Sequence, residues 1–199
     1  MIIALVGFMG AGKTTLGKKI SEAMSAEFVD LDQYIEKKES KKIIDIFEKN
    51  GEMAFRKMEE DHLQDLLEAH ISKHPEAISD LPEEGEETLV NYNDSEDARN
   101  NELPKRKCTL VISLGGGTVE SALCRDLIRR FTYCIYLKAD VKVLLDRLDK
   151  KAQKTRPKLE VPTENINKEE ISLKARIESL YERREPLYEE VARKIIKIQ

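Results

Sequence analysis

Residues 7–14, with the sequence GFMGAGKT, constrain the fold of this chain more than any other stretch. They have the spacing GxxxxGKT, follow the apolar run Ile2–Val6 and precede a segment with helical periodicity. In this strand–loop–helix order, glycines allow consecutive backbone N–H groups to turn toward an anion, and the helix N-terminus adds its positive dipole. The stretch therefore predicts a phosphate-binding loop; the alternative is a glycine-rich turn with an incidental lysine.

Two side chains of this loop would act on a bound nucleotide. Lys13 would reach the β- and γ-phosphates, and the Thr14 hydroxyl would be a ligand of Mg²⁺. The loop alone does not identify a second substrate, so the acceptor has to be sought elsewhere in the sequence.

The composition is that of a globular protein with more charge than average. Of the 199 residues, 40% are hydrophobic and 36% are charged, which is sufficient for one α/β domain and short for two. The net charge of −4 argues against general affinity for nucleic acid, because that requires a basic surface. We expect a single domain, and a monomer.

The cysteines and the N-terminus bear on location. Cys108, Cys124 and Cys134 lack CxxC spacing and are odd in number, which argues against a disulfide framework or a zinc site and favours a reducing compartment. The apolar run Ile2–Val6 is too short for the core of a signal peptide. We therefore expect a cytoplasmic protein without a membrane segment.

Alternating strand and helix patterns predict a parallel sheet that is covered by helices on both faces. The helical pattern over 33–70 is broken near Asn50-Gly51, and Pro186 indicates a helix stop. The expected strands are 2–6, 28–32, 110–114, 133–137 and 194–198, and the expected helices are 14–24, 33–70, 141–148 and 174–184.

Two stretches lack such periodicity. The region 74–107 contains an acidic segment, 76–102, with ten acidic residues against one basic residue, and it indicates a solvated, mobile insertion or else a docking site for a basic partner. The second stretch, about 150–167, is irregular and charged and carries Arg156-Pro157. A mobile lid there would bring a cation to the transferring phosphoryl group and exclude water.

Acidic residues follow the second expected strand. Asp30 and Asp32 lie two apart, so on a strand their side chains would point the same way into the crevice at the carboxyl edge of the sheet. One would hold Mg²⁺ through water and the other would accept a substrate hydroxyl, as phosphoryl transfer to an alcohol requires. The alternative is an Asp that caps the following helix.

Arginines and glycines complete the candidate acceptor site. Arg56 has Glu59 three residues later, which is either an exposed helical ion pair or a carboxylate that orients Arg56 to grip an anion. The triple glycine 115–117 would allow close approach of the main chain to a ligand. A further pair, Arg183-Arg184, lies just before Pro186.

Together these residues closely resemble the shikimate kinases, from Ile2 to about Ile196 with the acidic segment set aside. The resemblance implies a nucleoside-monophosphate-kinase-like P-loop NTPase fold, three α/β/α layers with a five-stranded parallel sheet, and transfer of phosphate from ATP to the 3-hydroxyl of shikimate, with Mg²⁺ as cofactor. The matching pieces are GFMGAGKT, DLD followed by QYIE, IFEKNGEMAFRKMEE, SLGGG, LLDRL, TRP and RREPLYEEVA.

The resemblance also implies residue roles. Lys13, Asp32 and Arg156 would be catalytic, Asp32 as the candidate base, and Thr14 with Asp30 would hold Mg²⁺. The residues implied to bind ATP are Gly10, Ala11, Gly12, Lys13, Thr14, Thr15, Arg147 and Arg156. Those implied to bind shikimate are Asp32, Phe47, Phe55, Arg56, Gly115, Gly116, Gly117 and Arg184, with Arg56 and Arg184 on its carboxylate.

The chain departs from the family pattern at three places. Lys158 stands where the family usually has leucine, the acidic segment 76–102 is additional, and family members continue beyond the last strand with an adenine-contacting loop. The last difference leaves two interpretations open: reduced nucleotide affinity, or a sequence that is a piece of a longer protein.

Other functions are compatible with a phosphate-binding loop. A gluconate-type or nucleoside-monophosphate kinase would share the fold, but the two arginines, Asp32 and the triple glycine argue against both. A non-catalytic binding protein would not need Lys13, Thr14 and the two aspartates. A GTPase is disfavoured because the sequence has no NKxD motif.

Overall fold

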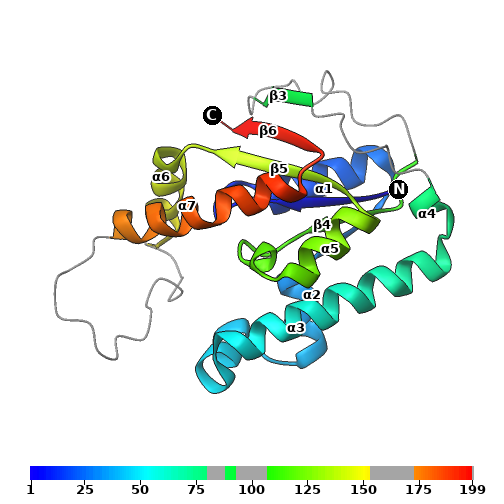
Figure 1. Cartoon of the computed structure of the whole chain (residues 1–199), viewed down its shortest axis with the longest axis horizontal. Coiled ribbons are helices and arrows are strands. Elements are labelled where there is room, and N and C mark those ends of the chain that lie inside the picture. Colours follow the sequence, from blue (N-terminus) through cyan, green and yellow to red (C-terminus); the bar gives the residue numbers. More distant parts are fainter. Residues whose placement is uncertain (80–87, 93–106, 153–172, 199) are drawn as a thin grey trace.

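The computed structural model describes residues 1–79, 88–92, 107–152 and 173–198 (Figure 1). Within them six strands form one sheet in the order β2-β4-β1-β5-β6-β3, and every neighbouring pair is parallel. The prediction of a parallel sheet is therefore confirmed. The strands are β1 (Ile2–Val6), β2 (Glu27–Asp30), β3 (Thr88–Tyr92), β4 (Leu110–Ser113), β5 (Tyr133–Ala139) and β6 (Lys194–Ile198).

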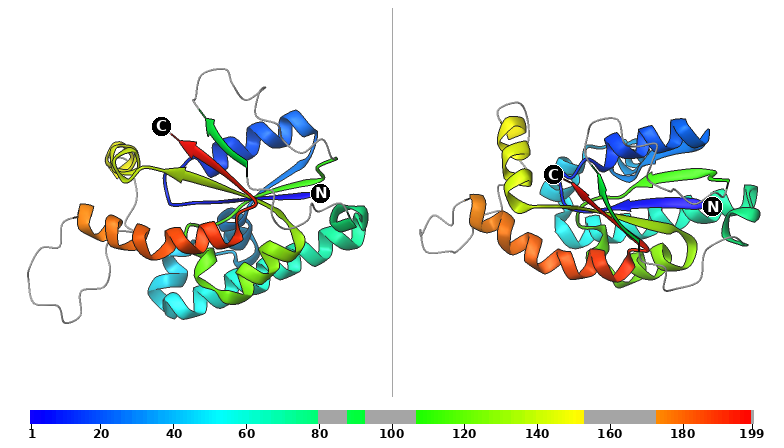
Figure 2. Two further views of the ribbon diagram at one scale, coloured as in Figure 1. Left: turned by 45° about the horizontal axis from the view of Figure 1, so that its top comes forward. Right: turned by 90° about the horizontal axis from the view of Figure 1, so that it is seen from above.

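Helices cover both faces of this sheet, which confirms the predicted three layers. Figure 2 shows α1 on one face and α3, α5 and α7 on the other. The helices are α1 (Lys13–Met24), α2 (Leu31–Glu39), α3 (Ile43–Lys73), α4 (Glu76–Ser79), α5 (Ala122–Phe131), α6 (Val141–Ala152) and α7 (Leu173–Val191), with a 3₁₀ turn, η2 (Thr118–Glu120).

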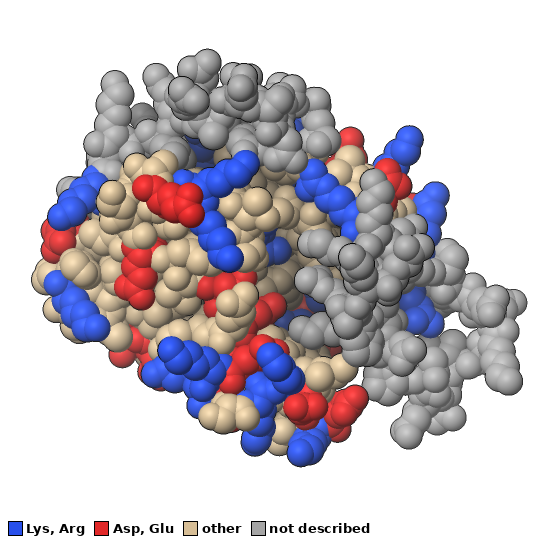
Figure 3. Space-filling view, turned by 180° about the vertical axis from the view of Figure 1, so that it is seen from behind, with Lys and Arg blue, Asp and Glu red and all other residues tan. Residues whose placement is uncertain are grey.

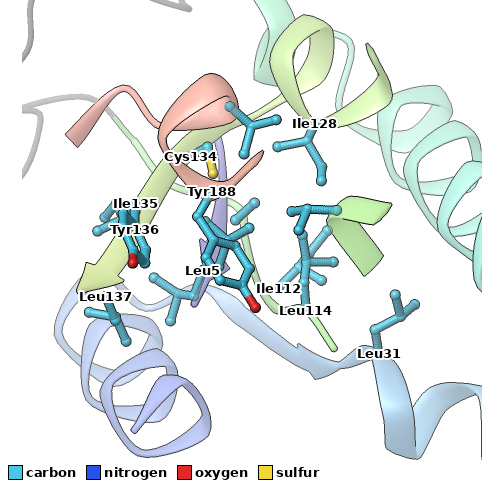
Figure 4. Close-up of a cluster of buried hydrophobic side chains, with 14 of the residues drawn as sticks. Leu5, Leu31, Ile112, Leu114, Ile128, Cys134, Ile135, Tyr136, Leu137 and Tyr188 are labelled. Atoms are coloured by element: carbon cyan, nitrogen blue, oxygen red, sulfur yellow. The ribbon is translucent and has the colours of Figure 1, made fainter. Parts of the chain in front are cut away.

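The core lies along the central strands (Figure 4). Every residue of β1 and of β4 is buried, because helices cover both faces and each strand has a neighbour on both sides. Tyr136 of β5 stacks on Tyr188 of α7 with ring centroids 5.1 Å apart, which fixes α7 against the sheet. This packing holds the carboxyl ends of the strands in fixed positions.

The strand register brings functional positions together at the carboxyl edge. Asp30, the last residue of β2, lies beside Ser113 of β4, and Ser113 lies beside Leu5 of β1. The loop that follows β1 and the start of α1 therefore lie next to the ends of β2 and β4. In parallel sheets of this kind, ligands bind at that edge.

Several elements differ from the sequence-based expectation. Helix α7 continues through Pro186, because buried Tyr188 and Val191 hold its last turns against the sheet in spite of the lost hydrogen bond. Helix α5 was not expected; Ser121 caps it by accepting a hydrogen bond from the Cys124 N–H. The break expected near Gly51 is confirmed, since its φ of 79° and ψ of 173° are not helical.

The region expected to be an insertion contains regular structure. Helix α4 occupies 76–79, and β3 adds a sixth strand to the five expected, beside β6 at the edge of the sheet. The rest of the acidic segment lies outside the described residues, as does most of the expected lid, including Arg156 and Lys158.

The structure also shows the state of the cysteines and the distribution of charge. Cys108, Cys124 and Cys134 are free and buried. Basic and acidic side chains are interspersed over the described residues on the face in Figure 3. None of the described helices combines the length and the apolar character needed to cross a membrane.

Candidate active site

The loop between β1 and α1 has the backbone that its glycines allow. Gly7, Gly10 and Gly12 have φ angles of 141°, 85° and 97°, a region that residues with a side chain rarely adopt. A Cβ at Gly7 would also lie 2.6 Å from the carbonyl oxygen of Leu137 in β5. Gly12 is the N-cap of α1, so the loop ends directly at a helix N-terminus.

Two cationic side chains border this loop. The Lys13 ammonium donates to the carbonyl oxygens of Gly7 at 2.7 Å and Phe8 at 3.1 Å. Arg147, on α6, donates to the Gly10 carbonyl at 3.4 Å, so the structure brings it to this loop. The loop is therefore positive at its rim and at its helix terminus, which suits a polyphosphate.

Oxygen ligands meet beside the loop. The Thr14 hydroxyl donates to the Asp30 carboxylate at 2.8 Å and lies 3.4 Å from the Ser113 hydroxyl. Hydroxyl and carboxylate oxygens are the ligands that Mg²⁺ prefers, and Mg²⁺ usually takes one or two from protein and the rest from phosphate and water. The described residues contain no group of three or more His, Cys, Asp or Glu side chains that could hold a metal ion.

The expectation that Asp30 and Asp32 share a strand is wrong. Strand β2 ends at Asp30, whose carboxylate accepts a hydrogen bond from the Gln33 N–H at 3.3 Å and so caps α2. Helix α2 therefore begins at Leu31, and Asp32 lies in its first turn. Asp32 nevertheless remains at the site, since its Oδ1 would be 3.0 Å from a Cβ on Gly115.

Arg56 and Glu59 form a buried ion pair on α3, not an exposed one. Glu59 is 1% exposed, is paired with Arg56 and accepts a hydrogen bond from the Thr118 hydroxyl at 2.6 Å. Burial raises the pKa of Glu59, and the positive charge of Arg56 opposes that shift. Glu59 thus holds Arg56 in position, and the binding of an anion by Arg56 stays a prediction.

A second carboxylate, Glu120 of η2, joins three arginines. Its Oε2 accepts from Arg56 Nη2 and from Arg184 Nη2, each at 3.1 Å, and its Oε1 accepts from Arg183. Burial disfavours the charged form of Glu120, but the arginines outweigh this effect and hold its pKa below the usual value. Arg56 from α3 and Arg184 from α7 therefore converge on one carboxylate oxygen.

The triple glycine lies between this cluster and the phosphate-binding loop. A Cβ at Gly117 would be 2.3 Å from Arg56 Nη2, and one at Gly115 would be 2.8 Å from Glu59 Oε1. At Gly116 the nearest atom would be the backbone nitrogen of Met9, at 3.4 Å. These glycines allow the arginine cluster and the phosphate-binding loop to come close to each other.

Aromatic side chains line the same region. Phe47 and Phe55 pack with ring centroids 4.6 Å apart, and the Arg184 guanidinium lies 6.0 Å from the Phe8 ring centroid. The Arg184 Nε is buried and has no hydrogen-bond partner among the described residues. The cluster therefore retains a donor that an additional acceptor would satisfy.

Most of the expected site residues are thus brought together, with Arg156 outside the described part of the chain. Sequence reasoning missed Glu120, Thr118 and Ser113. The only signal for them was their position close to the triple glycine in the sequence, Ser113 at the end of β4 before it and Thr118 and Glu120 in η2 after it.

Comparisons with known proteins agree with this geometry. A family model described as "Shikimate kinase" matches residues 9–74 and 76–199. Shikimate kinase from Chlorobium chlorochromatii is 35% identical over 94% of this chain and 77% of its own length, and that from Dictyoglomus turgidum is 32% identical over 98% and 87%.

Solved structures give the same result. Shikimate kinase from Acinetobacter baumannii, in complex with shikimate, has a TM-score of 0.68 at 30% identity and covers 98% of this chain and 82% of that one. The enzyme from Bacteroides thetaiotaomicron has a TM-score of 0.69 at 28% identity, over 99% and 86%. On these grounds, the chain belongs to the shikimate kinase family.

Proposed function

We propose that this protein transfers the γ-phosphoryl group of ATP to the 3-hydroxyl of shikimate, giving shikimate 3-phosphate and ADP. The observation that carries this proposal is the convergence of Arg56 and Arg184 on one carboxylate oxygen, beside a loop suited to polyphosphate. Two guanidinium groups from different helices recognise a carboxylate with strong, directional hydrogen bonds. A phosphate donor and a carboxylate-bearing acceptor would therefore bind side by side.

On the donor side, the backbone of residues 10–15 and Lys13 would bind the ATP phosphates, with Arg147 and Arg156 beside the nucleotide. Thr14 and Asp30 would hold Mg²⁺, the latter through water. The ion would neutralise charge on the phosphates during transfer. Lys13 would move its hydrogen bonds from the loop carbonyls to phosphate oxygens, which are stronger acceptors.

On the acceptor side, Arg56 and Arg184 would bind the shikimate carboxylate, and Gly115–Gly117 would allow the ring to approach the main chain. Phe47 and Phe55 would pack against the ring. Asp32 would accept hydrogen bonds from ring hydroxyls and take the proton from the attacking 3-hydroxyl. Its place in the first turn of α2 holds it next to Gly115.

Release of ADP from MgATP with and without shikimate tests the proposal, with a panel of other polyhydroxy acids including gluconate. We expect release that depends on shikimate and on Mg²⁺. Turnover of gluconate without turnover of shikimate would identify a different kinase of this fold. Nucleotide binding without turnover of any acceptor would indicate a non-catalytic protein.

We also propose that the chain acts as one domain, as a monomer in the cytoplasm. Met53 and Leu123 are the large hydrophobic residues exposed among those described, and the two lie on different helices. Such isolated apolar side chains do not make an interface. Three free, buried cysteines fit a reducing compartment. Light scattering after size-exclusion chromatography would detect a dimer if this proposal is wrong.

A further inference from the structure

The Glu120 carboxylate has the contacts that the proposed function assigns to the carboxylate of the substrate. Its Oε2 accepts from both Arg56 and Arg184 at 3.1 Å, which is the arrangement expected for a carboxylate held between two guanidinium groups. A substrate carboxylate would need the same N–H groups. The Glu120 carboxylate and a substrate carboxylate therefore compete for these N–H groups, and only one of them can accept both hydrogen bonds at full strength.

Glu120 is also the carboxylate of this cluster that can leave these arginines. Glu59 is 1% exposed and is held by Thr118 as well as Arg56, whereas the Glu120 side chain is 19% exposed and lies in a single 3₁₀ turn. Its other oxygen is already paired with Arg183, whose side chain is 62% exposed. Glu120 therefore has an alternative partner in addition to Arg56 and Arg184.

Resting on the proposed function, we propose that Glu120 is an internal competitor for the substrate carboxylate. It occupies the subsite formed by Arg56 and Arg184, and the substrate carboxylate displaces it onto Arg183. The unpartnered Arg184 Nε would gain an acceptor in this exchange. Glu120 thus lowers the affinity for every carboxylate, and a ligand that also makes contacts through its ring hydroxyls overcomes this cost while a simple carboxylate does not.

The central test is the KM for shikimate, together with the dissociation constant from calorimetry, in the wild-type protein and in Glu120→Gln. Glutamine keeps the shape of the side chain but removes the competing charge. We expect the KM and the dissociation constant to fall roughly five-fold, the change expected from loss of one partly exposed ion pair, with the effect on KM and not on kcat. A residue that only positions the arginines would give the opposite result, a raised KM.

Arg183→Gln provides a second, independent test that leaves Arg56 and Arg184 unchanged. Without Arg183, Glu120 loses its alternative partner, so the KM for shikimate should rise a few-fold in the wild-type background. In the Glu120→Gln background the same change should have no effect. Equal effects in both backgrounds would mean that Arg183 and Glu120 act independently, and would overturn the inference.

Two controls separate competition from a general change of charge. Asp126→Asn removes a carboxylate whose ion pair is with Arg130 of α5, at 3.2 Å, and it should leave the KM unchanged. The methyl ester of shikimate lacks the charged group, so its binding should not improve in Glu120→Gln. An equal improvement for the ester would contradict competition at the carboxylate subsite.

The outcomes also distinguish this inference from the proposed function. Absence of shikimate-dependent ADP release by the wild-type protein would overturn both. Release by the wild-type protein, with an unchanged or raised KM in a folded Glu120→Gln variant, would overturn this inference alone.

Discussion

At the scale of single residues, Lys13 is the side chain on which the proposed chemistry depends most. We expect Lys13→Ala to lower kcat about a hundred-fold or more, because it removes a positive charge from the oxygens that gain charge during transfer. The measurement is steady-state ADP release at saturating shikimate. Lys19→Ala, on the exposed side of the same helix, is the matched control and should keep wild-type turnover. Near-normal turnover of Lys13→Ala would remove the loop from the catalytic machinery.

His70 gives a residue-scale prediction about stability. It is 6% exposed near the end of α3, lies 2.9 Å from the Thr109 hydroxyl and packs against His74. Burial lowers its pKa, as do the charges of His74, the N-terminal amine and Lys73, while Glu27 acts in the opposite direction.

Because the folded-state pKa of His70 is lowered, the unfolded chain binds a proton more readily. The free energy of unfolding should therefore fall as the pH drops below about 6.5, by at most about 1.4 kcal/mol per pH unit for one group. Urea unfolding at pH 7.5 and 5.5 measures this, and His70→Gln should reduce the difference between the two values. Thr109→Val keeps the imidazole and should retain the difference; an unchanged difference in His70→Gln would contradict the prediction.

At the scale of elements, helix α7 contains a proline in its interior, where proline disfavours helix formation. Pro186 is exposed in the interior of this helix and supplies no N–H for a hydrogen bond. We expect Pro186→Ala to raise the free energy of unfolding by roughly 1–3 kcal/mol. Urea denaturation measures the change, with Glu182→Ala, one turn earlier and also exposed, as the control. A less stable Pro186→Ala protein would mean that the proline is required for the path of α7.

The elements also show how far sequence reasoning reached. Strands β1 and β4 could be predicted because they are continuous apolar runs buried on both faces, and the loop after β1 because its glycines and lysine have a fixed spacing. The start of α2 could not be predicted, because residues 29–32 alternate in polarity like a strand. Strand β2 ends at Asp30 only because the Asp30 side chain caps α2.

The arginine cluster was harder to predict for a different reason. Glu120 lies 64 residues from both Arg56 and Arg184 in the sequence, so no local pattern indicates that the three will meet. Strand β3 is a five-residue segment within acidic sequence, too short to give a clear periodic signal. Tertiary contacts, and not local preference, determine both features.

At the scale of the whole molecule, the sheet separates β3 from the candidate active site. Strand β3 is at the edge, and β6 and β5 lie between it and β1. Replacing residues 80–106 by a short Gly/Ser linker should therefore leave kcat within about two-fold and lower the free energy of unfolding through the lost pairing with β6. A short linker is sufficient because His70, in the helix before the segment, lies 2.9 Å from the hydroxyl of Thr109, just after it.

Activity assays and urea denaturation of this deletion variant test the separation. A large loss of kcat in a folded protein would assign the removed segment to the catalytic machinery. Insoluble protein would show that the pairing of β3 with β6 is required for folding.

The pairing of β1 has a consequence for how the chain folds during synthesis. Among the described strands, β1 pairs with β4 and β5. Ile2 can therefore pair only after Leu110 has been synthesised, and Ile3 can pair with β5 only after Tyr133 has been synthesised. At roughly 5–20 residues per second, the ribosome completes the start of β5 on the order of ten seconds after it has completed β1. Strand β1 is thus made well before both of its partners, and the phosphate-binding loop that follows it takes shape late on the nascent chain.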